Sequence, residues 1–275
     1  MRSTLKKMAR DWLPSVAKRK VNRLLGRVIR FEGEFASWEE ARAHSDGYDA
    51  EGIHARVLAA AIEVREGRAE FERDSVLFDE IEYAWPVLSG LLWAAARSAG
   101  TLNVLDMGGA LGSGYFQNRK FLQALPDVRW NVVEQAHFVA SGKRHIQDEK
   151  LRFYQTIEEC LEENSPNVIV LSSVLQYLRS PTEVIQKLNG VGAMCLIIDR
   201  TPFQSGSGDA LVIQKVPATV YSASYPMWIF SRPEFMRILA PHWCPVITYV
   251  CPEGSARTES GLDFCFEGML LEARS

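Results

Sequence analysis

The sequence predicts an α/β protein in which helices cover a mostly parallel sheet. From about residue 100, short runs rich in Val, Ile and Leu alternate with stretches long enough for helices. One of these runs, residues 101–107, leads directly into a glycine-dense turn. Hydrophobic residues make up 47% of the 275-residue chain, which is enough for a substantial core. Continuous apolar runs are typical of strands buried on both faces, and therefore of a parallel sheet with crossover helices.

The first 30 residues form a basic arm. They hold ten Lys and Arg against the single acid Asp11, a balance of +9 in a chain of net charge −3, so the rest of the chain carries −12. Apolar residues recur at helical spacing on both sides of Pro14. We expect an amphipathic arm that either lies on an anionic membrane surface or packs on its own domain. The acidic remainder disfavours nucleic acid as a partner.

Residues 31–99 are expected to form a helical cap, because they are rich in Ala, Glu and Arg with apolar residues at helical spacing. The longest apolar stretch, residues 85–96, is interrupted by Ser89 and Gly90. It falls short of the ~20 residues that cross a bilayer, so we expect a buried helix. The predicted organisation is therefore an arm over 1–30, a cap over 31–99 and a core over 100–275.

The core is expected to close with elements that depart from strict alternation. Strands are predicted at 101–107, 128–134, 167–171, 193–199, 211–216, 245–251 and 262–272. Ser231 and Glu234 have the spacing of a capping box, which predicts a helix from there to Ala240.

The five cysteines fit no zinc-binding spacing and leave an odd count. We expect free thiols in a reducing compartment, and no metal site. The amino terminus is charged throughout, so no secretory signal is expected. These observations predict a cytoplasmic protein, located at the inner membrane face if the arm binds lipid.

The most informative stretch is the turn that follows Asp106, which contains Gly108, Gly109, Ala110 and Gly112. Glycines let the backbone approach a ligand closely, and the next helix offers unpaired N–H groups. The glycine spacing fits neither the dinucleotide fingerprint nor a P-loop. It resembles the first motif of class I S-adenosylmethionine-dependent methyltransferases, acid-x-Gly-x-Gly-x-Gly, with Ala110 at the middle glycine. The resemblance implies that these five residues bind S-adenosyl-L-methionine.

Further residues extend the cofactor site. Glu134 ends the next apolar run and is placed to accept hydrogen bonds from both ribose hydroxyls, as a methyltransferase and a dehydrogenase both require. Thr156 is a candidate for the adenine edge. Ser172 and Ser173 resemble the motif after the fourth strand of these enzymes, which faces the methyl group; alternatively, Ser172 only caps a helix.

The chain resembles more closely a family of bacterial methyltransferases associated with surface-polysaccharide and other biosynthetic genes. The resemblance runs from about Phe31 to the carboxyl end. Besides the glycine turn and Tyr83, it is carried by residues 47–48, 72–78, 172–178, 199–203 and 221–230. It implies a Rossmann-like class I methyltransferase sheet with an antiparallel carboxyl-terminal strand. It also implies methyl transfer, most simply to an oxygen of a small molecule or glycan, leaving S-adenosyl-L-homocysteine.

Asp199 and Tyr177 are the candidate catalytic residues, because each follows or ends a predicted strand where open parallel sheets bind ligands. Asp199 could remove a proton from a hydroxyl acceptor; alternatively it pairs with Arg200 or caps a helix. His137 and His242 are conceivable bases, although a lone histidine is more often structural.

Aromatic residues suggest where the acceptor binds. Tyr221, Tyr225 and Trp228 fall in one short segment, and their rings suit a sugar, a planar acceptor or a sulfonium cation. The competing interpretation is a hydrophobic plug. Tyr83 is a candidate lid over the cofactor, or a residue that simply packs beside Trp85.

Two other functions are compatible with the sequence. One is a nicotinamide-dependent oxidoreductase, which the glycine spacing disfavours. The other is a non-catalytic binding protein of the same fold.

Overall fold

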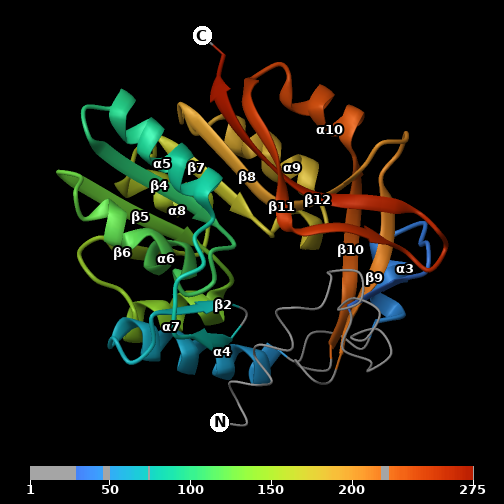
Figure 1. The fold of residues 1–275 in the computed structure, drawn as a ribbon, viewed down its shortest axis with the longest axis horizontal. Coiled ribbons are helices and arrows are strands. Elements are labelled where there is room, and N and C mark those ends of the chain that lie inside the picture. The colour runs from blue at the N-terminus through green and yellow to red at the C-terminus, as the bar shows by residue number, and fades with distance from the viewer. Residues whose placement is uncertain (1–28, 46–49, 74, 218–222, 275) are drawn as a thin grey trace, which may run out of the picture. The chain divides into compact units, whose positions relative to one another are not determined.

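The computed structural model describes residues 29–45, 50–73, 75–217 and 223–274 (Figure 1). The predicted arm over 1–30 lies outside these residues except for Ile29 and Arg30, and so does Tyr221. Contacts divide the chain into two units. The small unit comprises residues 1–48, 211–227 and 257–262, and the core unit comprises residues 49–210, 228–256 and 263–275.

The core unit contains the predicted sheet. Its strands are β4 (Thr101–Met107), β5 (Asp127–Val133), β6 (Leu151–Tyr154), β7 (Val168–Ser172), β8 (Cys195–Gln204), β11 (Trp243–Arg257) and β12 (Asp263–Ala273). They follow the order β6-β5-β4-β7-β8-β12-β11 (Figure 1). The strands from β6 to β8 are parallel, and β12 is antiparallel to β8. This is a Rossmann-like sheet, mostly parallel with an antiparallel closing strand, as predicted.

Helices precede or join these strands, as the alternating pattern predicts. They are α5 (Trp85–Arg97), α6 (Ser113–Leu122), α7 (Ala136–His145), α8 (Ile157–Glu163), the 3₁₀ helix η1 (Leu175–Tyr177), α9 (Pro181–Asn189) and α10 (Arg232–Leu239). Helix α5 packs on β4, β8 and β12, whereas α8 packs on β5 and β6. Gly90 brings α5 close to the sheet, since a Cβ there would lie 2.9 Å from Cδ1 of Ile197.

The core is built from the apolar runs. Trp130 of β5, Phe153 of β6, and Ile169 and Leu171 of β7 are almost completely buried. Burying one such side chain contributes roughly 1.5–3 kcal/mol, which explains why continuous apolar runs were sufficient to locate β5 and β7.

The predicted helical cap contributes to both units. Helix α4 (Ala50–Arg65) and a hairpin of β2 (Phe71–Arg73) and β3 (Val76–Phe78) belong to the core unit. Helix α3 (Trp38–Ala43) belongs to the small unit. The hairpin was not predicted, because its two strands are short and lie among residues with helical spacing.

The small unit brings distant parts of the chain together. Strand β1 (Arg30–Glu32) pairs antiparallel with β9 (Ala210–Val216), and Nζ of Lys215 lies 2.6 Å from Oε2 of Glu32. Strand β9 is followed in the sheet by β10 (Ala223–Ser231). The sequence predicted β9 but neither β1 nor β10.

The predicted capping box at Ser231 is wrong. Helix α10 does begin after Ser231, but that side chain makes no capping hydrogen bond; its hydroxyl donates to the carbonyl of Gly206 at 2.8 Å. Oε1 of Glu234 instead accepts from the N–H of Gly208, at 3.1 Å. The glycine loop before β9 therefore competes successfully for both side chains.

No helix within the described ranges combines the length and hydropathy that a bilayer crossing requires. Helix α5 covers the longest apolar stretch and buries most of one face, including Leu88 and Leu91. All five cysteines are free thiols.

Candidate functional site

The glycine turn joins β4 to α6. Gly108 and Gly112 have φ angles of +71° and +88°, in the left-handed region that glycine adopts without a steric cost. A Cβ on Gly108 would overlap the side chain of Val174. Ala110 also has a positive φ, +50°, which costs a residue with a Cβ about 1–2 kcal/mol. The turn therefore needs left-handed backbone at the position where the motif usually has its middle glycine.

Asp106 lies beneath this turn. It is only 4% exposed, and Nε1 of Trp130 donates a hydrogen bond to its Oδ2 at 2.8 Å. A Cβ on Gly109 would overlap the same carboxylate, so the backbone of the turn rests directly on it. Burial raises the pKa of Asp106 to about 7 against the opposing effect of the Trp130 hydrogen bond, and the charge of Glu134 raises it further. Asp106 thus supports the turn from inside.

Glu134 reaches the turn from the neighbouring strand. It directly follows β5, and its carboxylate accepts hydrogen bonds from the N–H groups of Gln135, at 2.6 Å, and of Ala110. Burial raises the pKa of Glu134, while these two hydrogen bonds lower it. The structure therefore brings Glu134 and Ala110 into contact at the turn.

A third carboxylate, Glu72, comes from the β2–β3 hairpin. It is 2% exposed; Oε1 accepts from the hydroxyl of Ser113, the first residue of α6, and Oε2 accepts from the N–H of Ser75 at 3.3 Å. Sequence reasoning included Glu72 only in the family resemblance. No motif in the sequence indicates that an acidic residue of the predicted helical cap contacts the helix after the glycine turn.

Thr156 caps a helix. It is the exposed N-cap of α8, and its Oγ1 accepts from the N–H of Glu159 at 3.0 Å. Oε2 of Glu159 in turn accepts from the N–H of Gln155, the residue before the N-cap, at 2.7 Å. The hydroxyl proposed for the adenine edge is used to begin the helix.

Asp199 forms the centre of a second cluster, at the carboxyl end of β7. It is 5% exposed and pairs in register with Ser172. The hydroxyl of Ser172 donates to Oδ2 at 3.0 Å, and Nε of Arg200 lies 3.8 Å from the same oxygen. The hydroxyl of Tyr249 donates to Oδ1 at 2.9 Å, and Sγ of Cys251 lies 3.5 Å from it. Both carboxylate oxygens of Asp199 therefore accept hydrogen bonds.

The backbone around this cluster is strained. Ser173 and Arg200 have φ angles of +54° and +49°. The N–H of Ser173 donates to the carbonyl of Asp199 at 2.9 Å, and Nε2 of the fully buried Gln176 donates to the carbonyl of Arg200 at 3.1 Å and to Oγ of Ser173 at 3.2 Å. Non-glycine residues held in this region cluster at ligand-binding sites.

Two predicted site residues lie near this cluster, Tyr177 next to Gln176 in the chain and Trp228 through a contact with Leu178. Tyr177 ends η1 and is half-buried. Nε1 of Trp228 donates to the carbonyl of Leu178 at 3.0 Å, and the indole packs partly buried on the core. Trp228 thus anchors the segment after η1, as the interpretation of a hydrophobic plug expects.

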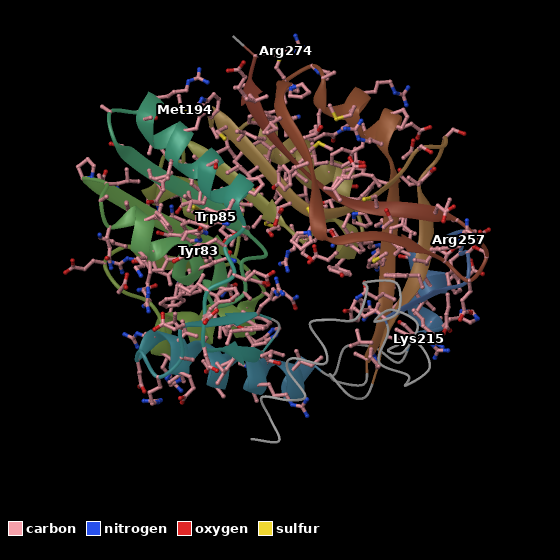
Figure 2. All side chains as sticks on the ribbon, viewed as in Figure 1. Tyr83, Trp85, Met194, Lys215, Arg257 and Arg274 are labelled. Atoms are coloured by element: carbon pink, nitrogen blue, oxygen red, sulfur yellow. The ribbon has the colours of Figure 1, made fainter. Side chains whose placement is uncertain are left out.

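The remaining predicted aromatic residues lie elsewhere. Tyr225 belongs to the small unit, where its hydroxyl accepts from Nε2 of Gln214 at 3.2 Å. Tyr83 lies beside Trp85 at the start of α5, with ring centroids 5.0 Å apart, and 5.1 Å from the ring of Phe121 (Figure 2). Tyr83 therefore has the packing that was the alternative to a lid.

His137 packs against other rings. Its centroid lies 5.0 Å from that of His54 and 4.7 Å from that of Phe138. Burial, and then the neighbouring His54, lower the pKa of His137. Among the residues that the structure describes, no group of three or more His, Cys, Asp or Glu side chains is placed to hold a metal ion.

Comparison with known proteins gives partial structural likenesses. No family model matches the sequence, and no curated protein matches it. The N-terminal domain of EvdMO1, solved with SAH and D-fucose, is 14% identical, with a TM-score of 0.45 over 82% of this chain and 98% of that one. The 1,6-didemethyltoxoflavin-N1-methyltransferase of Burkholderia thailandensis is 15% identical, with a TM-score of 0.38 over 83% and 92%. CalS10, an amino pentose methyltransferase from Micromonospora echinaspora, is 12% identical, with a TM-score of 0.41 over 70% and 90%.

The candidate site thus has two parts in the core unit. One is the glycine turn, which Glu72, Asp106 and Glu134 approach from three different strands. The other is the hydrogen-bonded carboxylate of Asp199, which lies on β8 beside the carboxyl end of β7.

Proposed function

We propose that this protein is an S-adenosylmethionine-dependent methyltransferase. The observation that carries the proposal is that the carboxylates of Glu72 and Glu134 lie at the glycine turn, which rests on the buried side chain of Asp106. S-adenosyl-L-methionine brings a sulfonium and an ammonium group to such a turn, whereas a dinucleotide brings a pyrophosphate. Negative charge attracts the first and repels the second.

The start of α6 adds a second argument against a dinucleotide. In dinucleotide sites the pyrophosphate binds the unpaired N–H groups at a helix N-terminus. Here the carboxylate of Glu72 already lies against Ser113, the first residue of that helix. A nicotinamide-dependent oxidoreductase is therefore the weaker hypothesis.

We assign the cofactor contacts as follows. The backbone of the turn, at Gly108, Gly109, Ala110 and Gly112, lets the cofactor approach closely. Glu134 accepts hydrogen bonds from the ribose hydroxyls. Glu72 faces the ammonium of the amino-acid part, while Asp106 supports the turn from below. Ser172 and Ser173 lie where the methyl group is presented.

The acceptor is a small molecule or glycan that is methylated at a hydroxyl oxygen. In-line displacement at a sulfonium needs alignment of donor and acceptor, together with removal of the hydroxyl proton. Asp199 is the proton acceptor that lies at the carboxyl end of the sheet. S-adenosyl-L-homocysteine is the product.

The basic arm governs location in this proposal. Residues 1–30 would bring a cytoplasmic enzyme to an anionic membrane face, because positive charge and apolar residues add in membrane binding. The acidic remainder of the chain argues against a nucleic-acid acceptor.

Isothermal titration calorimetry tests the cofactor. We expect S-adenosyl-L-homocysteine to bind, and NAD and NADP to give no heat of binding. Binding of a dinucleotide without S-adenosyl-L-homocysteine would reverse the assignment. If S-adenosyl-L-homocysteine binds but no label passes from methyl-tritiated cofactor to a small-molecule extract of the source cells, the protein is a binding protein of this fold.

A further inference from the structure

We propose that Tyr249 is a second catalytic residue, which receives the acceptor proton and passes its own to Asp199. The proposal rests on the methyltransferase function above and adds a residue that no sequence motif indicated. Its basis is the path by which the Tyr249 side chain reaches Asp199.

Tyr249 reaches Asp199 across an intervening strand. Tyr249 lies on β11 and Asp199 on β8, with β12 between them in the sheet. The crossing passes over Gly268 of β12, where a Cβ would overlap Cζ and Oη of Tyr249. The pairing of β12 with β8 shifts its register at the same place, between Glu267 and Met269. Glycine and the irregular register together make the 2.9 Å hydrogen bond possible.

The solvent exposure of Tyr249 and Asp199 indicates which of the two side chains contacts the acceptor. Tyr249 is half-buried, whereas Asp199 is buried and its two oxygens already accept from Tyr249 and Ser172. An incoming hydroxyl therefore meets the phenol oxygen, which has lone pairs to offer, more readily than the carboxylate.

The phenol does not act as the base alone. Burial first, and then the charge of Asp199, raise the pKa of Tyr249 above its usual range, so Tyr249 keeps its proton at neutral pH. The proton that Tyr249 gains must be balanced by one that it gives up. Oδ1 of Asp199 is the acceptor already in hydrogen-bond contact.

The step balances. A lone pair of the acceptor oxygen forms the bond to the methyl carbon while the carbon–sulfur bond breaks, and its electron pair turns the sulfonium into a neutral thioether. The acceptor proton passes to Oη of Tyr249 as the Tyr249 proton passes to Oδ1 of Asp199. The enzyme ends the step with Asp199 protonated, and solvent removes that proton before the next turnover.

The test compares Tyr249→Phe and Asp199→Asn with the control Tyr154→Phe. Tyr154 also donates to a carboxylate, Oε2 of Glu163 at 3.0 Å, but lies on β6. The probe is methyl-tritiated S-adenosylmethionine with a small-molecule extract of source cells that lack the gene. We expect Tyr249→Phe and Asp199→Asn each to lower kcat by roughly 10²-fold. Their affinity for S-adenosyl-L-homocysteine should stay unchanged, and the control should keep wild-type kcat.

Gly268→Ala provides a test that leaves both functional groups in the chain. The added methyl group displaces the phenol from Asp199, so kcat should fall while the cofactor still binds. Wild-type kcat in Tyr249→Phe or in Gly268→Ala would overturn the role of Tyr249 and leave the methyltransferase function standing. No label transfer by the wild-type protein would overturn both.

Discussion

The indole N–H of Trp130 donates a hydrogen bond to Oδ2 of Asp106 across the neighbouring strands β4 and β5. Both side chains are buried, and the glycine turn rests on the carboxylate. The contact holds the carboxylate in place beneath the glycine turn. It also places an ionisable group in surroundings that disfavour its charge.

Stability should therefore depend on pH through Asp106. The pKa of Asp106 rises from 3.8 in the unfolded chain to about 7 in the folded protein, so between these pH values the folded state binds more protons. The free energy of unfolding then falls as pH rises from about 4 to 7, by at most about 1.4 kcal/mol per pH unit from this group. Asp106→Asn keeps an acceptor for Trp130 and removes this dependence. Urea unfolding at pH 5 and pH 7.5 checks it; equal pH slopes in variant and wild type would contradict it.

Glu134→Ala should weaken binding of S-adenosyl-L-homocysteine and of 5′-methylthioadenosine alike, because both ligands carry the ribose that we assign to Glu134. A hydrogen bond to a charged group contributes about 1.5–3 kcal/mol, so the affinity should fall by roughly ten- to a hundredfold. Calorimetry measures both. Glu158→Ala is the matched control, since Glu158 is exposed and paired with Lys187 on the surface. Unchanged affinities in Glu134→Ala would refute the ribose assignment.

Glu72→Gln should discriminate between the same two ligands. Glutamine keeps an acceptor for Ser113 but removes the charge that faces the ammonium, a group that 5′-methylthioadenosine lacks. We expect about a tenfold loss of affinity for S-adenosyl-L-homocysteine and little change for 5′-methylthioadenosine. An equal loss for both ligands would mean that Glu72 only holds the fold around the turn.

Ala110→Gly should relieve the strain in the turn. Ala110 has a φ of +50°, so glycine should raise the free energy of unfolding by about 0.5–1 kcal/mol after its greater unfolded-state entropy is counted. Ala99→Gly is the matched control, because Ala99 has the same φ of +50° after α5, away from the turn. Denaturant unfolding should show the gain in both variants. Loss of stability in Ala110→Gly would show that the methyl group of Ala110 supports the turn.

Deleting residues 1–28 should abolish co-sedimentation with anionic liposomes while leaving cofactor binding intact. The deletion spares Arg30, which pairs in register with Lys215 in the small unit. Neutral liposomes are the control for the charge dependence. Equal binding by the full chain and the shortened chain would exclude the arm as a membrane contact.

The sequence pattern predicted those parts of the fold that depend on residues close together in the chain. The buried strands β4, β5, β7 and β8 were predicted because apolar runs of that length have few other uses, and Glu134 followed from its place at a strand end. The cluster partners could not be predicted in this way. Glu72 meets Ser113 only because of an unpredicted hairpin, and Tyr249 meets Asp199 only because Gly268 leaves room on the strand between them.

The sequence pattern was misleading where a distant segment forms hydrogen bonds with the same side chains. Ser231 and Glu234 have the spacing of a capping box, yet Gly206 and Gly208 take up both side chains. Thr156 illustrates the reverse case. Its hydroxyl, which sequence order assigned to the cofactor, accepts a capping hydrogen bond from the N–H of Glu159 in the helix that it begins.

The small unit has a consequence for synthesis on the ribosome. Strand β1 leaves the ribosome before its partner β9, which begins at Ala210, and the segment 257–262 comes later still. At ~5–20 residues per second, β1 waits on the order of 10–40 s for β9. During that interval all strands from β4 to β8 are made and have time to pair. Nascent chains should therefore assemble the central sheet first and complete the small unit afterwards.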